Sequence, residues 1–169
     1  AAYEEVREGR RVANSNGAML AAAVREAGAA PQRLGIARDT LEDIAARLAG
    51  ALHADALVVS AGASMGEHDL VKDALERHGF RLAFWRARVR PGSPLAFATI
   101  PRDGAPPLPV FSLPGNPVSA LVCFYLYVPP ALRKMTGHEK LFLPTVHATM
   151  GAEVAKAKGL TEFIRCRIT

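Results

Sequence analysis

The chain has 169 residues, of which 50% are hydrophobic and 22% are charged, and its formal net charge is +5. This composition provides a buried core for one globular domain, excludes wholesale disorder and favours anionic ligands. The longest apolar stretch, residues 118–132, contains two prolines and is too short to predict a membrane span.

The two ends of the chain and its cysteines give further expectations. The first residue is not Met and the closing TEFIRCRIT alternates like an interrupted strand, so we expect a fragment of a longer protein. We divide it into an N-terminal remnant (1–13), an α/β domain (14–140) and the start of a truncated β domain (141–169), in which LFLPTVHATM and LTEFIRCRIT are expected to be two strands. Cys123 and Cys166 have no metal-ligand spacing, which predicts two reduced, buried thiols in a cytoplasmic protein.

The first predicted elements are a helix and a strand. Residues 17–28, GAMLAAAVREAG, are rich in alanine and therefore favour a helix. Ser15 or Asn16 is suited to cap the start of this helix. A short strand is predicted at residues 34–37.

Two more helices flank a second strand. DTLEDIAARLAGAL places apolar side chains on one face of a helix at 40–52, and Asp39 with Glu42 fits a capping arrangement. ALVVS, residues 56–60, is a continuous apolar run of the kind that is buried on both faces of a parallel sheet. After a glycine-punctuated loop, LVKDALERHG predicts a helix at 70–78.

Strands dominate the next segment. Residues 82–90, LAFWRARVR, alternate as a strand, and PLAFATI and PVFSL predict two more, separated by the loop PRDGAPPLP. PVSALVCFYLYV predicts an apolar helix, with Asn116 as its N-cap and Pro117 at its first position. This order predicts an α/β fold: a three-layer, doubly wound, mostly parallel sheet with helices on both faces, plus the start of a small β domain.

Ligands of such folds bind at the carboxyl ends of the strands, and the loop SAGASMGEHD follows one of them. Its glycines permit close backbone approach, so backbone N–H groups before the next helix could hold a phosphate. Asp69 would then be a ligand of a divalent cation that binds the same phosphate. The alternative is that Asp69 only caps the helix at 70–78. The anion-binding candidates in the loop are Ser60, Gly62, Ser64, Gly66 and Glu67.

Two further loops have similar alternatives. Asp39 is either a helix N-cap or a metal ligand. SLPGNPVS is more specific, because a stiff turn precedes a helix N-terminus and its polar rim suits an anionic ligand. The alternative is that SLPGNPVS is an ordinary connection between a strand and a helix and binds no ligand. The residues of this rim are Pro114, Gly115, Asn116 and Pro117.

Arginines form the most concentrated positive charge of the sequence. Arg86, Arg88 and Arg90 recur at spacing two, so in a strand they would point to one face. Guanidinium groups bind phosphate and other oxyanions well, and the alternative is a solvated strand face. Nucleic acid is not expected as the partner, because aromatic residues are few and no RNP-like motif occurs.

Five stretches, in the same order, resemble the molybdopterin molybdenumtransferase family, which includes the E domain of gephyrin. They are SNGAMLAAAVREAG, LGIARDT, ALVVSAGASMGEHDLVKDAL, FWRARVRPGSPLAFA and LPGNPVSALVCFYLYVPPALRKMTG. Together they cover about residues 14–137, and several ordered motifs are far more specific than any one loop. In the family this region is the molybdopterin-binding domain of a longer protein that ends in a β domain.

The resemblance implies that adenylylated molybdopterin and molybdate give molybdenum cofactor and AMP, with a cation such as Mg²⁺. Asp39 and Asp69 match the carboxylates that organise the cation and the pyrophosphate, which makes them the implied catalytic and metal-binding residues. Arg86 and Arg90 match positions that are usually lysine and are linked to anion or molybdate binding. Pro114–Pro117 match the rigid rim.

The resemblance also implies partners. We expect small-molecule substrates, a homo-oligomer such as a dimer in the full-length protein, and neither nucleic acid nor membrane. The fragment alone is expected to be a poor catalyst, because in the family another domain of a partner subunit completes the site.

Departures from the family pattern leave alternatives open. Ala61 stands where the family usually has glycine, which costs about 1 kcal/mol if this residue needs positive φ. Molybdopterin adenylyltransferases and competence-damage proteins share the fold but usually carry a different glycine loop, and Glu67-x-Asp69 favours the molybdenum-inserting branch. A non-catalytic scaffold domain, as in gephyrin, is the third possibility.

Overall fold

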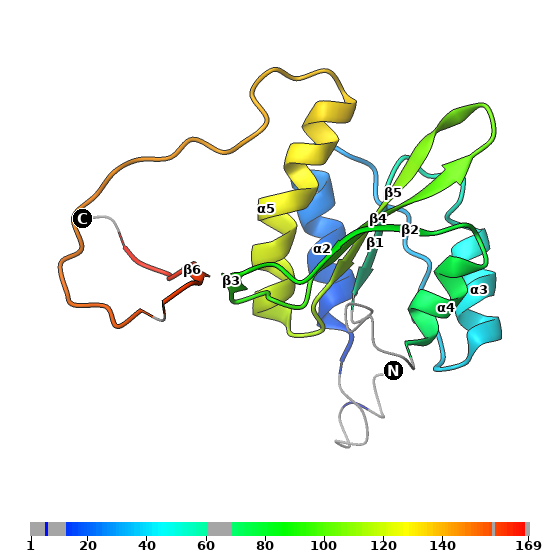
Figure 1. Cartoon of the computed structure of the whole chain (residues 1–169), viewed down its shortest axis with the longest axis horizontal. Coiled ribbons are helices and arrows are strands. Elements are labelled where there is room, and N and C mark those ends of the chain that lie inside the picture. Colours follow the sequence, from blue (N-terminus) through cyan, green and yellow to red (C-terminus); the bar gives the residue numbers. More distant parts are fainter. Residues whose placement is uncertain (1–5, 7–12, 61–68, 157, 168–169) are drawn as a thin grey trace.

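The structure, a computed structural model, describes residues 6, 13–60, 69–156 and 158–167. Within these ranges a four-stranded sheet lies between two layers of helices (Figure 1). The sheet consists of β1 (Leu57–Ser60), β2 (Arg81–Trp85), β4 (Ala96–Arg102) and β5 (Ala105–Leu113). The helices are α2 (Ser15–Glu26), α3 (Leu41–Ala49), α4 (Leu70–Glu76) and α5 (Pro117–Met135).

Two apolar cores explain the three layers. Ile44 and Leu48 of α3 and Leu75 of α4 pack against one face of the sheet. On the other face, α2 and α5 pack together, and Phe124 of α5 is fully buried there. Buried side chains of β5 belong to both cores, which confirms the prediction of helices on both faces.

The described sheet is mixed, so the prediction of a mostly parallel sheet is wrong for these strands. The strand order is β1-β5-β4-β2, and β1 pairs with β5 in parallel, while β5–β4 and β4–β2 are antiparallel. β4 turns directly into β5, because Arg102 pairs with Ala105 and Gly104 has a φ of +67°. A two-residue turn of this kind forms a hairpin and fixes the antiparallel direction.

The segment PRDGAPPLP is therefore mostly strand and not the predicted loop. Its prolines donate no N–H, which usually argues against a strand. In β5 they are tolerated because β1 pairs only with residues 110–113, so the first half of β5 has a second edge without a strand partner among the described residues.

The helix caps lie close to the predicted positions. Asp69 caps α4, and Asn116 caps α5 with Pro117 in its first turn, as predicted. Helix α2 is capped by Asn14, which accepts a hydrogen bond from the Gly17 N–H, and not by Ser15 or Asn16. Helix α3 is capped by Thr40 and not by Asp39. Both corrections are shifts of one or two residues.

Three predicted strands are corrected. Residues 34–37 form no strand, and residues 141–150 form none either. The predicted strand at 82–90 is interrupted, since β2 ends at Trp85 and Arg86 has a φ of 68°. The chain then forms β3 (Val89–Arg90), which pairs in parallel with β6 (Thr161–Glu162) in a separate two-stranded sheet. A strand needs a hydrogen-bonding partner, and local alternation in a sequence does not supply one.

The prediction that Cys166 is buried is wrong, because this residue is exposed. In the native protein, we therefore expect alkylation at pH 8 to modify one thiol, that of Cys166. Cys123 is fully buried, and burial raises the pKa of its thiol from 9.0 to about 11. The folded protein favours the neutral form of this thiol. The stability that the neutral Cys123 thiol contributes is complete below pH 9 and is lost as the pH rises towards 11. Mass spectrometry after iodoacetamide treatment checks this. A second label in native protein would contradict it.

No helix in the described part of the chain is long and apolar enough to cross a membrane.

Candidate functional site

The carboxyl ends of β1 and β5 lie side by side, because these two strands are parallel neighbours. Helices α2, α4 and α5 begin at the same end of the sheet (Figure 1). The positive end of a helix dipole and its unpaired N–H groups favour anions. Neither α2 nor α5 carries an acidic residue in its first turn, whereas α3 carries two. This edge of the sheet is the candidate site.

One side chain joins three parts of the site. The Nδ2 group of Asn16 donates a hydrogen bond to Ser60 Oγ at 2.8 Å and another to the Gly115 carbonyl oxygen at 2.8 Å. These bonds connect the first turn of α2, the end of β1 and the loop after β5. Sequence reasoning considered Asn16 only as a helix cap. The available signal was that NSNG, residues 14–17, contains a second asparagine, Asn14, which is sufficient for the cap.

Asp69 lies in the site with a defined structural role. Its side chain is 8% exposed, and its Oδ1 accepts hydrogen bonds from Val71 N at 2.9 Å and Lys72 N at 3.2 Å. Capping by a carboxylate also matches its negative charge to the positive end of α4. The prediction that Asp69 caps this helix is therefore confirmed. The metal-binding role of Asp69 stays a prediction, and capping by one oxygen does not exclude it.

Asp39 lies on the exposed segment that leads into α3. This segment is held by Asp43, whose Oδ2 accepts hydrogen bonds from Arg38 N at 2.7 Å and Arg47 Nε at 3.0 Å. The Arg38 N–H and then the Arg47 side chain lower the pKa of Asp43. Sequence reasoning missed Asp43, which occupies the capping-box position that it had assigned to Glu42. The shared role of Asp39 and Asp69 in holding a cation stays a prediction.

The described residues contain no group of three or more His, Cys, Asp or Glu side chains that could hold a metal ion by themselves. Four of the predicted anion-binding residues and the unusual Ala61 lie outside the described residues. Those four are Gly62, Ser64, Gly66 and Glu67.

The rim of the site is the loop from Pro114 to Pro117. Pro114 is buried, whereas Gly115, Asn116 and Pro117 are exposed. Asn116 accepts a hydrogen bond from Ser119 N at 3.1 Å through its Oδ1 and thereby fixes the start of α5. The rim is thus a stiff turn that leads into a helix of 19 residues. The sequence predicts this stiff turn before the start of the helix.

The arginines do not share one strand face. Arg86 N donates to the Leu95 carbonyl oxygen at 2.8 Å, and Ala87 N donates to the Ser93 carbonyl oxygen at 3.0 Å. These bonds continue the pairing of β2 onto the residues that precede β4, but the φ of 68° at Arg86 interrupts the extended backbone. This interruption explains why the spacing-two pattern fails.

Two of these arginines have partners within the chain. The guanidinium of Arg86 lies 4.5 Å from the centre of the Trp85 ring, which is a cation–π contact. Arg90 Nη1 lies 3.8 Å from Glu162 Oε1, although 72% of the Arg90 side chain remains exposed. An exposed ion pair of this kind contributes little stability and leaves the guanidinium accessible to an anion. Anion binding by Arg86 and Arg90 stays a prediction.

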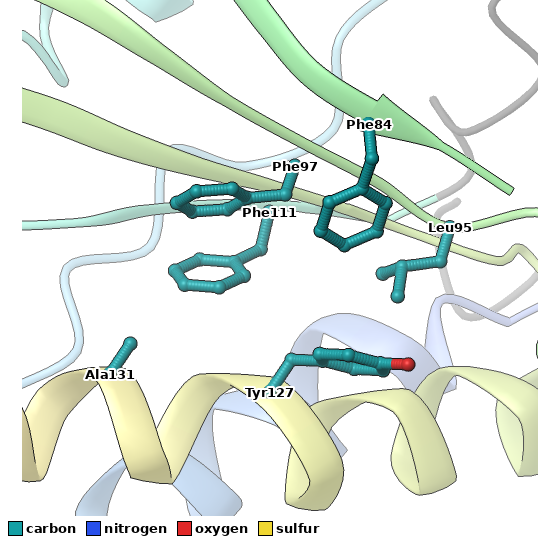
Figure 2. Close-up of a pocket in the computed structure, with 6 residues that line it drawn as sticks. All are labelled: Phe84, Leu95, Phe97, Phe111, Tyr127 and Ala131. Atoms are coloured by element: carbon teal, nitrogen blue, oxygen red, sulfur yellow. The ribbon is translucent and has the colours of Figure 1, made fainter. Parts of the chain in front are cut away.

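An apolar cavity of about 190 Å³ lies between the sheet and the second half of α5 (Figure 2). Three phenylalanine rings from the sheet face Tyr127, whose hydroxyl is the one polar side-chain atom among the six lining residues. Such a lining does not suit a phosphorylated ligand. The cavity also lies away from the first turn of α5, so it is not part of the candidate site. Its lining residues are Phe84, Leu95, Phe97, Phe111, Tyr127 and Ala131.

Comparisons with known proteins agree on one family. The model of the probable molybdopterin binding domain matches residues 4–134. Molybdopterin molybdenumtransferase of Nostoc sp. is 36% identical over 136 residues, which are 79% of this chain and 30% of that protein. Gephyrin of Dictyostelium discoideum is 37% identical over 158 residues, 83% of this chain and 21% of that protein.

A solved structure is similar as well. The crystal structure of the molybdopterin biosynthesis moea protein from Pyrococcus horikosii has a TM-score of 0.64 and 32% sequence identity, covering 77% of this chain and 31% of that one. The chain thus spans between 21% and 31% of the lengths of these three proteins.

Proposed function

The chain belongs to the molybdopterin-binding domain family of molybdenum cofactor biosynthesis, and from this premise we propose that it serves molybdate insertion. In the proposed reaction, adenylylated molybdopterin and molybdate are converted to molybdenum cofactor and AMP. The observation that carries the proposal is the joined edge of β1 and β5, where Asn16 links Ser60 to Gly115 beside two helix N-termini.

The proposal assigns a role to each group at this edge. The Ser60 hydroxyl and the Val118 N–H at the start of α5 bind phosphate oxygens, since both are hydrogen-bond donors in a positive field. The Pro114–Pro117 rim keeps these donors in place without loss of backbone entropy on binding. Arg86 and Arg90 attract molybdate, because guanidinium groups bind oxyanions in a bidentate manner.

A divalent cation such as Mg²⁺ fits the residues that are present. Mg²⁺ is usually held by one or two carboxylates together with substrate phosphates and water, not by a dedicated protein cage. This agrees with the donor set, in which no cluster of three ligands occurs among the described residues. We assign Asp69, with Asp39, to hold it. When bound, the cation neutralises charge on the pyrophosphate.

The remaining assignments belong to the longer protein. We propose that the domain acts in the cytoplasm and within a homo-oligomer such as a dimer. Since the chain spans at most about a third of the similar proteins named above, we expect the isolated chain to bind molybdopterin and to catalyse insertion poorly.

AMP release tests the proposed reaction. We expect a full-length protein carrying this domain to release AMP from adenylylated molybdopterin only when molybdate is added, and chromatography of the nucleotide measures this. The same assay without molybdate is the control. Release of pyrophosphate from ATP and molybdopterin would instead assign the domain to adenylyl transfer.

A further inference from the structure

We propose that Asn16 is a positioning residue of the molybdopterin site, which holds the Ser60 hydroxyl as a donor to the phosphate of the ligand. This inference rests on the proposed function and assigns a role to a side chain that the predicted site does not include. Three observations carry it.

The orientation of the Asn16 amide is determined by its partners. The Gly115 carbonyl oxygen can only accept a hydrogen bond, so the group that faces it at 2.8 Å must be the amide nitrogen. The second proton of the same nitrogen then goes to Ser60 Oγ at 2.8 Å. Asn16 thereby joins the end of β1 to the loop after β5.

This arrangement determines what Ser60 can do. A hydroxyl has one proton to donate and two acceptor positions. Asn16 uses an acceptor position of Ser60 and leaves its proton, which donates to no other described group. Ser60 is therefore oriented as a donor, and it faces an edge at which two helices begin without an acidic residue in their first turns. An anionic ligand oxygen is the matching acceptor.

The other half of the Asn16 amide indicates a functional role. Its Oδ1 is buried and accepts no hydrogen bond from the residues that the structure describes. Buried side-chain oxygens in folded proteins almost always have a partner, because leaving one without a partner costs stability. Asn16 is therefore not optimised as a purely structural link. Its position is explained by the donor that it holds.

Helix α2 offers a matched control for the experiment. Asn14 is the N-cap of the same helix, and among the described residues its side chain bonds only to the Gly17 N–H, at 2.9 Å. We expect Asn14→Ala and Asn16→Ala to lower the urea midpoint to a similar extent. Titration calorimetry with metal-free molybdopterin should show Kd raised at least tenfold by Asn16→Ala and less than twofold by Asn14→Ala.

Two further measurements separate positioning from simple loss of structure. With dephosphorylated molybdopterin, Asn16→Ala should change Kd less than twofold, because the phosphate that Ser60 contacts is missing. The double variant Asn16→Ala with Ser60→Ala should bind no more weakly than Ser60→Ala alone.

The outcomes distinguish the two proposals. If the wild-type chain binds molybdopterin and Asn16→Ala binds it as tightly as Asn14→Ala, the role of Asn16 is wrong and the proposed function stands. An equal loss for both forms of the ligand, or an additive loss in the double variant, also overturns the role of Asn16. If the wild-type chain binds no molybdopterin, the proposed function fails and the inference fails with it.

Discussion

Asp69→Asn is expected to reduce molybdate-dependent AMP release by roughly 100-fold or more without destabilising the fold. Asparagine caps helices as well as aspartate does, so the hydrogen bonds from Val71 N and Lys72 N can be retained. The substitution removes the negative charge that we assign to cation binding. Activity of a full-length protein carrying the domain, measured beside urea denaturation, separates the two roles of Asp69.

A second carboxylate on the same helix provides the control. Asp73 lies in the first turn of α4, so Asp73→Asn removes the same charge from the same helix end. We expect this variant to keep AMP release within about twofold of wild type. Asp69→Ala should also cost about 1 kcal/mol of stability, because alanine cannot cap the helix. Equal activity of the Asp69→Asn and Asp73→Asn variants would exclude the cation role.

The helices and their caps could be predicted because their signals are local. Asn116 followed by Pro117 marks the start of α5, and the amide and ring act within one turn. The one-residue error at α3 has the same origin. Asp39 and Thr40 are both good caps, and the choice depends on Asp43, which holds the backbone of Arg38.

The sheet could be predicted only in part, because pairing is not local. ALVVS and PVFSL were recognised as strands, and β1 and β5 are indeed parallel neighbours. The direction of β4 was not, since it depends on the two-residue turn at Gly104 inside a segment whose prolines indicate a loop. The end of β2 was missed as well, because the positive φ of Arg86, which interrupts the strand, has no signal in the alternating sequence.

The candidate site could also be predicted only in part. Ser60, Asp69 and the Pro114–Pro117 rim follow strands or precede helices, so sequence position alone places them at one edge. Asn16 is far from both of its partners along the chain: Ser60 is 44 positions away and Gly115 is 99 positions away. No local pattern could have connected them.

The second large effect that we expect is the destabilisation of the fold by Gly92→Ala, by about 3 kcal/mol or more. Gly92 has a φ of +110°, and a Cβ atom added there would lie 2.3 Å from Cys123 Sγ. The backbone strain contributes about 1–2 kcal/mol and the overlap in a packed interior about 1–3 kcal/mol. Because Cys123 is fully buried on α5, its sulfur has little room to move away. Urea denaturation measures the loss.

Two companion variants separate the strain from the overlap. Gly104 also has a positive φ, +67°, but nothing lies within 4 Å of its Cβ position, so Gly104→Ala should cost only about 1 kcal/mol. Cys123→Ala removes the sulfur that collides with the new Cβ. Combined with Gly92→Ala, it should give a loss at least about 1 kcal/mol smaller than the sum of the single losses. Additive losses would show that the segment from Arg86 to Ser93 is not fixed on α5 by this contact. A coupled loss would show that the contact holds in place the segment that carries the candidate anion-binding arginines.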